Sequence, residues 1–253
     1  MHTDVAEIAR DALAFREKLL RTKAGLQPDA FWYPYDSLGN FIHFDRLLTG
    51  GNRSAFSDFR GLTIADIGAA DGDTSFFLES LGNDVDIIDN APTNFNGLRG
   101  AAALKHHFAS SVRIHEVDLD AQFSLPREHY DVVFFLGILY HLKNPFYVLE
   151  MLARRTGRCF LSTKVAKFAK PGGLHIERIP VAYLLDPDEA NNDATNYWVF
   201  TNAGLRRLLD RTGWDVLDYM TVGNTTTSDP ATPAGDERAF CYLRSRTWAA
   251  SQR

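Results

Sequence analysis

The chain has 253 residues, of which 45% are hydrophobic and 23% charged, and its net charge is −5 at pH 7. This composition is ordinary for a soluble globular protein and lacks the basic excess that is typical of general nucleic-acid binders. Only two cysteines occur, the first residues are acidic where a signal peptide is basic, and no apolar run is long enough to span a bilayer, so we expect a cytoplasmic protein with no membrane partner.

The first 57 residues predict a helical extension. Residues 4–26 alternate apolar and charged positions at helical spacing, and residues 42–48 form a second, shorter helical pattern. Between them, residues 31–41 are rich in aromatic and turn-forming residues. Tyr33 and Tyr35 are candidate acceptor-binding residues in a lid, and the alternative is a loop that fills the core with its rings.

Residues 62–74 form an apolar strand followed by a turn of small residues. Gly68 and Ala69 allow a ligand to lie against the backbone, since they remove side-chain bulk. The turn lacks the Lys and Ser/Thr of a phosphate loop and carries Asp66, Asp71 and Asp73 instead. These carboxylates favour a ligand with an ammonium group, although an acidic turn can also be merely solvated.

Two further strands end at acidic residues. Residues 85–88 lead to Asp89 and Asn90, at the spacing where a doubly wound fold binds ribose hydroxyls, and residues 112–117 lead to Asp118 and Leu119. The alternative for each Asp is a helix N-cap.

The fourth strand, residues 130–136, delivers Tyr140 and His141 just beyond its carboxyl end. His141 is the first candidate for a general base because imidazole titrates near neutral pH, and Tyr140 is a candidate for orienting the reactants. A structural imidazole is the alternative, and His43 and His175 are weaker rivals.

These motifs resemble known enzymes. Residues 62–74 resemble motif I of class I S-adenosylmethionine (SAM) dependent methyltransferases. Residues 137–145, with residues 33–40 and 221–227, resemble the family of the bacterial tRNA wobble-uridine carboxymethyltransferase, over about residues 31–227. The resemblance implies SAM as cofactor, bound by Asp66, Gly68, Ala69, Asp71, Asp89, Asn90, Asp118, Leu119 and Leu136.

The sequence departs from that family in the groups that hold the carboxylate of its modified cofactor. Tyr140 matches the family's Tyr, but residues 32–35 offer no Lys, and no counterpart of its C-terminal Arg is evident. Ordinary SAM is therefore the expected cofactor.

A long insertion, residues 166–200, follows the fifth strand at residues 158–164. His175, Asn196 and Trp198 are its candidates for acceptor recognition. Its carboxylates could bind a divalent metal such as Mg²⁺ that activates the acceptor, but no spacing specifies a site, so metal ligands remain unknown.

The last elements are a helix over residues 201–209 and strands over residues 214–222 and 239–244, the final one antiparallel in the resembling superfamily. The predicted fold is α/β: a Rossmann-like, seven-stranded, mostly parallel sheet with helices on both faces, formed by residues 58–253.

The predicted function is methyl transfer to a small polar acceptor, with a hydroxyl of a saccharide as the leading class and nucleic acid disfavoured by the charge. The first alternative is a tRNA wobble-uridine (carboxy)methyltransferase, which requires a local basic face. The second is a non-catalytic SAM-binding or partner-binding module. A homodimer is compatible with the sequence.

Overall fold

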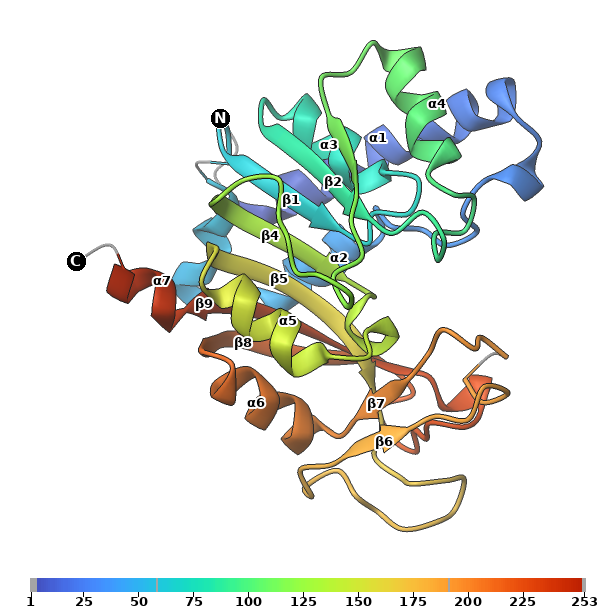
Figure 1. The fold of residues 1–253 in the computed structure, drawn as a ribbon, viewed down its shortest axis with the longest axis vertical. Coiled ribbons are helices and arrows are strands. Elements are labelled where there is room, and N and C mark those ends of the chain that lie inside the picture. The colour runs from blue at the N-terminus through green and yellow to red at the C-terminus, as the bar shows by residue number, and fades with distance from the viewer. Residues whose placement is uncertain (1–3, 58, 191, 252–253) are drawn as a thin grey trace. The chain divides into compact units, whose positions relative to one another are not determined.

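The computed structural model describes residues 4–57, 59–190 and 192–251 (Figure 1). The chain divides into two compact units, residues 1–134 and residues 135–253. Each unit is described by itself.

The first unit is a parallel α/β layer. Its strands are β1 (Thr63–Ile67), β2 (Asp84–Asp89), β3 (Arg113–Glu116) and β4 (Tyr130–Leu136, which ends in the second unit), in the order β3-β2-β1-β4. β1 pairs with β2, and β2 with β3, in parallel. β1 and β2 are buried along nearly their whole length, as expected for parallel strands covered on both faces. The crossover helices are α3 (Asp73–Ser80) and α4 (Arg99–Phe108).

The predicted N-terminal extension is helical. Helix α1 (Val5–Leu26) is capped by the Asp4 carboxylate, which accepts a hydrogen bond from the amide of Ala6. The short helices η1 (Asp29–Phe31), α2 (Asn40–Leu47) and η2 (Gly50–Phe56) follow. Phe41 of α2 packs its ring 4.9 Å from that of Phe77 of α3. The extension therefore shares its core with the sheet layer.

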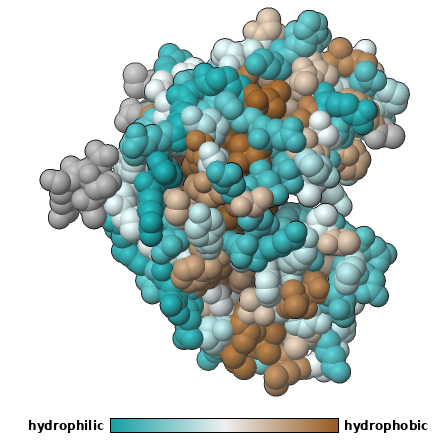
Figure 2. Space-filling view, viewed as in Figure 1, coloured by the Kyte–Doolittle hydropathy of each residue, from teal (hydrophilic) through white to brown (hydrophobic). Residues whose placement is uncertain are grey.

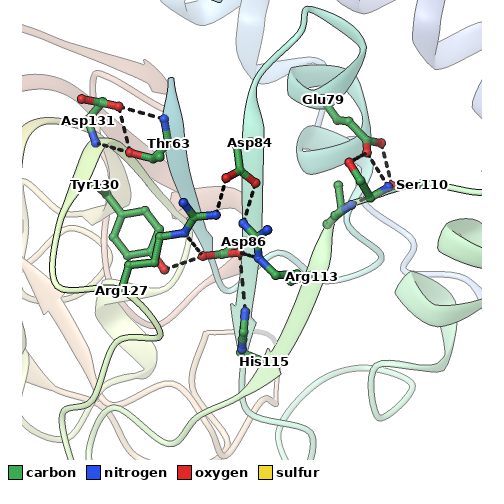
Figure 3. Close-up of polar contacts among 12 residues, drawn as sticks. Thr63, Glu79, Asp84, Asp86, Ser110, Arg113, His115, Arg127, Tyr130 and Asp131 are labelled. Carbon is green, nitrogen blue, oxygen red and sulfur yellow. Dashed lines mark hydrogen bonds and ion pairs between the residues drawn. The ribbon is translucent and has the colours of Figure 1, made fainter. Parts of the chain in front are cut away.

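An ion network around the buried Asp86 ties the start of β2 to its neighbours in the first unit (Figure 3). The Asp86 side chain is fully buried and accepts hydrogen bonds from Arg113, Arg127 and the Tyr130 hydroxyl. Both arginines also pair with Asp84. Because two guanidinium groups and a hydroxyl already satisfy Asp86, we regard this cluster as structural.

The second unit is built on antiparallel pairing. β5 (Thr156–Val165) pairs with β9 (Glu237–Ser245), which pairs with β8 (Trp214–Gly223), both in antiparallel fashion. The antiparallel last strand is confirmed. Helices η3 (Leu139–His141), α5 (Pro145–Ala153), α6 (Asn202–Arg211), η4 (Pro233–Gly235) and α7 (Arg246–Ser251) complete this unit.

The expected insertion is mostly loop and contains one short hairpin. β6 (Ala182–Leu184) pairs antiparallel with β7 (Trp198–Phe200), and β7 pairs with the end of β5. Apolar side chains gather at the lower end of Figure 2, where Figure 1 places β6 and the loop before it. Leu174 and Leu184 there are 67% and 64% exposed.

The α/β, Rossmann-like fold class is confirmed, with nine strands among the described residues where seven were expected. The two additional strands are β6 and β7, which are only three residues long. Within the described residues, no helix has the length and apolar character needed to cross a membrane.

Candidate functional site

The turn after β1 is shaped by left-handed backbone. Gly68, Ala70 and Gly72 have φ angles of 71°, 53° and 81°. The amide of Gly68 donates to the carbonyl of Ile88, which holds the turn against the end of β2. Residues 68–70 carry nothing larger than a methyl group, Ala69 among them, so a ligand can approach the backbone closely.

Asp66 lies inside this unit rather than at the surface of the turn. It is 3% exposed and accepts a hydrogen bond of 2.6 Å from the Ser75 hydroxyl of α3. Burial raises the pKa of Asp66 to about 7, the Ser75 hydrogen bond opposes this shift, and the charges of Asp89 and Asp73 add to it. Asp66 therefore contacts α3 directly through Ser75. It interacts with Asp89 and Asp73 only through their charges.

Asp71 is enclosed by protein donors. One oxygen accepts from the Lys23 ammonium at 3.0 Å and the Tyr33 amide at 2.8 Å, and the other accepts from the Asn96 side chain at 2.8 Å. Asp71 is 2% exposed. This carboxylate fastens the N-terminal extension to the turn, and its predicted contact with the cofactor stays a prediction.

Lys23 is the residue of this region that sequence reasoning missed. Its ammonium also pairs with Asp73 at 2.8 Å and lies 5.3 Å from the centre of the Trp32 ring. Burial raises the pKa of Asp73, and the Lys23 charge opposes that shift. A helical Lys in an alternating apolar and charged pattern gives no sign that it reaches acids about 50 residues away.

Gly100 of α4 closes the same cluster. A Cβ there would lie 2.1 Å from Asp71 Oδ1 and 2.6 Å from Asn96 Nδ2, whereas a Cβ at Gly25 of α1 would meet nothing within 4 Å.

Two matched substitutions test this packing. Gly100→Ala is expected to lower the free energy of unfolding by about 1 to 3 kcal/mol because it overpacks a buried polar cluster. Gly25→Ala is expected to raise it by about 0.5 to 1 kcal/mol, since alanine restricts the unfolded chain. Urea denaturation measures both, and equal effects of the two substitutions would contradict the close contact at Gly100.

Asp89 lies at the end of β2, beside the turn. Its oxygens accept hydrogen bonds from the amides of Ala70 and Asn90, at 3.1 and 2.8 Å, and from the Asn94 side chain at 3.0 Å. Burial raises the pKa of Asp89, and these hydrogen bonds oppose the shift. A carboxylate has about four acceptor positions, so one remains beyond these three contacts. Asn90 contributes its amide to this arrangement.

Asp118 and Leu119 follow β3. Asp118 is exposed and accepts from the amides of Asp120 and Ala121 within a turn; the next element is strand β4, so the helix N-cap alternative is wrong for this residue. Leu119 is 5% exposed. A cofactor-binding role for this pair stays a prediction.

Three aromatic rings lie together in the first unit. The Tyr33 ring is 5.3 Å from that of Tyr35 and 6.0 Å from that of Phe95. Tyr35 and Phe95 are 66% and 54% exposed. These rings do not fill the core, which favours the lid interpretation of Tyr33 and Tyr35 and adds Phe95 to it.

In the second unit, two cations approach Tyr140 just beyond Leu136 and the end of β4. Arg238 donates to the Tyr140 hydroxyl at 3.3 Å, and the Lys164 ammonium lies 5.9 Å from the ring centre. Lys164 and Arg238 are directly opposite each other in the β5–β9 pairing. Asp236 pairs with both, at 3.1 and 3.6 Å. Arg238 is thus an arginine near the C-terminus that reaches Tyr140, a contact the sequence did not reveal.

His141 is held by the insertion. Its Nδ1 lies 3.1 Å from the carbonyl oxygen of Thr195 and 3.0 Å from its hydroxyl. The Thr195 hydroxyl donates in turn to Asp193 at 2.6 Å. Burial lowers the pKa of His141, while the Thr195 carbonyl and the Asp193 charge oppose that shift. The imidazole is therefore neutral near pH 7.

The remaining insertion candidates differ in their surroundings. The Trp198 indole donates to the carbonyl of Leu142, and the Asn196 side chain donates to the carbonyl of Ala190. Asn196 is 5% exposed, and its Oδ1 has no hydrogen-bond partner among the described residues. His175 pairs with Glu177 on an exposed loop. Within the described residues it makes no polar contact with His141, Thr195 or Asp193.

The acids of the insertion do not gather around a common point. Glu177 pairs with Lys167, and Glu189 accepts from the Tyr183 hydroxyl. Over residues 4–57, 59–190 and 192–251, no group of three or more His, Cys, Asp or Glu side chains could hold a metal ion.

Comparison with known proteins adds sequence and structural relatives. No family model matches the chain. The chain is 28% identical over 251 residues to a tRNA U34 carboxymethyltransferase of Marinobacter nauticus, an alignment that covers 89% of this chain and 71% of that protein. The N-terminal domain of EvdMO1, solved with SAH bound, has a TM-score of 0.58 at 19% identity, covering 91% of this chain and 97% of that one. It was also solved in the presence of SAH and D-fucose.

A third relative is the 1,6-didemethyltoxoflavin-N1-methyltransferase of Burkholderia thailandensis, with a TM-score of 0.50 at 20% identity over 74% of this chain and 72% of that one. The chain has the class I methyltransferase fold. In open α/β sheets ligands bind outside the carboxyl ends of the strands, which is where the structure places Gly68 and Asp89.

Proposed function

We propose that this protein is a SAM-dependent methyltransferase that methylates a hydroxyl group of a small polar acceptor, with saccharides as the first class to test. The observation that carries the proposal is the hydrogen bond between the turn after β1 and Asp89, in which the Ala70 amide donates to the Asp89 carboxylate. A carboxylate at the end of the second strand, beside a turn without bulky side chains, is suited to the ribose and methionine parts of SAM.

Methyl transfer from a sulfonium is an in-line displacement, so the protein mainly has to align donor and acceptor and accept a proton. The neutral His141 suits the second task. The exposed rings of Tyr35 and Phe95 suit the face of a sugar or another ring. The structurally similar EvdMO1 domain was solved in the presence of SAH and D-fucose, which makes sugars the first probes.

The buried, unpaired cysteines Cys159 and Cys241 support a reducing compartment such as the cytoplasm. A homodimer also remains a proposal.

A second candidate function is carboxymethyl transfer to tRNA. It is favoured by the Marinobacter relative and by the position of Arg238 at the Tyr140 hydroxyl, which supplies two of the three groups that the resembling family uses for a carboxylate. However, Asp236 pairs with both Arg238 and Lys164 and takes up part of their charge. This neutralisation and the missing Lys lead us to favour unmodified SAM.

The deciding experiment incubates the protein with metabolite extracts or with total tRNA, using isotopically labelled SAM or its carboxylated analogue, and follows the label by mass spectrometry. We expect label from SAM in a small hydroxyl compound, and no labelling with Asp89→Ala. Transfer from the carboxylated analogue to tRNA alone, lost in Arg238→Gln, would establish the second candidate instead. No transfer to any acceptor, with intact SAM binding, would favour a non-catalytic module.

A further inference from the structure

The groups around His141 define which of its ring nitrogens carries the proton. Its Nδ1 has two neighbours within 3.1 Å, the carbonyl oxygen and the hydroxyl oxygen of Thr195. A carbonyl oxygen can only accept a hydrogen bond. A hydrogen bond at this position therefore requires the proton to be on Nδ1.

Asp193 makes the Thr195 hydroxyl an acceptor toward Nδ1, like the Thr195 carbonyl. The Thr195 hydroxyl is 2.6 Å from Asp193 Oδ1, and this carboxylate also accepts from the Thr195 amide at 2.9 Å. Burial raises the pKa of Asp193, but the two Thr195 hydrogen bonds, together with the charges of His141 and Lys164, bring it below its usual value, so the carboxylate is charged and can only accept. The hydroxyl proton thus points to Asp193, and its oxygen presents a lone pair to Nδ1.

The insertion that carries Thr195 is fastened to the segment that carries His141. The amide of Tyr197 donates to the carbonyl of Tyr140 at 2.8 Å, and the Trp198 indole donates to the carbonyl of Leu142 at 3.0 Å. These hydrogen bonds flank His141 on both sides in sequence. They fix the distance between Thr195 and the imidazole.

We infer that Asp193 and Thr195 are positioning residues that hold His141 with its proton on Nδ1, so that Nε2 is the basic nitrogen of the proposed methyl transfer. This inference rests on the proposed function. In the step, the acceptor O–H bond breaks and its proton moves to Nε2, while an oxygen lone pair forms the O–CH₃ bond. The C–S bond breaks and its electron pair stays on sulfur, which becomes a neutral thioether. The imidazolium then releases its proton to water.

Charged groups on the neighbouring elements act on His141 in opposite directions. The Asp193 carboxylate favours the imidazolium that forms during the step, whereas Arg238 of β9 and Lys164 of β5 disfavour it. Removing the Asp193 charge should therefore weaken His141 as a base without moving the two cations.

The test is ¹⁵N NMR of the full-length protein with labelled histidine, with His141→Gln identifying the His141 signals. We expect neutral His141 to carry its proton on Nδ1, which is not the tautomer that a free imidazole side chain prefers. A proton on Nε2 in the wild-type protein would overturn the inference. The NMR measurement needs neither cofactor nor acceptor. A proton on Nε2 would therefore contradict this inference alone, whereas a failure of the proposed function would appear as absent SAM binding.

Substitutions extend the test. In Asp193→Asn, the pKa of His141 is expected to fall, the acid limb of the pH–rate profile to move to lower pH, and the rate of labelling from SAM to fall about threefold to tenfold, with SAM affinity unchanged. Thr195→Ser keeps the hydroxyl and should retain the rate within about twofold. An unchanged His141 pKa in folded Asp193→Asn would also contradict the inference.

Discussion

Lys23→Met is expected to lower the free energy of unfolding by about 3 to 5 kcal/mol, the effect typical of removing one partner of a buried ion pair. The Lys23 side chain is 8% exposed and faces Asp71 at 2% and Asp73 at 17%. Methionine fills similar space but leaves two carboxylates close together with no cation. Chemical denaturation of the folded variant measures the loss.

Two controls separate this charge effect from the loss of a lysine on α1. Lys18→Met removes an exposed lysine of the same helix that lies over the Phe15 and Phe108 rings, and it should cost at most about 1 kcal/mol. Adding Asp73→Asn to Lys23→Met should recover part of the stability, since one of the stranded charges is removed. A Lys23→Met variant as stable as Lys18→Met would show that the buried pair does not hold the extension.

Asp89→Ala is expected to weaken SAM binding by about 10-fold to 100-fold. Hydrogen bonds to a charged group each contribute about 1.5 to 3 kcal/mol, and the ribose hydroxyls would lose this acceptor. The substitution also releases the amides of Ala70 and Asn90, which loosens the turn that approaches the cofactor.

Isothermal titration calorimetry with SAM and with S-adenosylhomocysteine measures this change. Asp118→Ala is the matched control, because Asp118 is exposed and bonded only to nearby amides. We expect Asp118→Ala to weaken SAM binding much less than Asp89→Ala does. Equal affinities of Asp89→Ala and the wild-type protein would remove Asp89 from the cofactor site.

The parallel strands of the first unit were predictable because each is an apolar run with a turn or an acid at its carboxyl end. The antiparallel last strand followed from family resemblance. Helix α5 was not predicted, although Asn144 followed by Pro145 is a helix-start signal, since its residues are apolar on most sides and show no clear period. β6 and β7 are too short for an alternating pattern.

The acidic residues of the candidate site were predicted from their positions at the ends of strands. The residues that pair with the site residues were not predicted. Lys23 meets Asp71 across 48 residues, and Arg238 meets Tyr140 across 98. The second contact depends on the β5–β9 register that places Arg238 opposite Lys164. Such contacts are set by pairing and packing, which a local motif does not encode. Asp71, predicted from its position to bind the cofactor, is one such case, since donors from distant segments surround its carboxylate.

The central claim is that a sulfonium nucleoside binds at the β1 turn with its ribose at Asp89. The most direct measurement is amide NMR of the labelled wild-type protein during titration with S-adenosylhomocysteine. The account predicts saturable shifts concentrated at Gly68, Ala70 and Asn90, and their loss in Asp89→Ala. Absence of any shift in the folded protein, or shifts confined to residues away from the ends of β1 and β2, would contradict it.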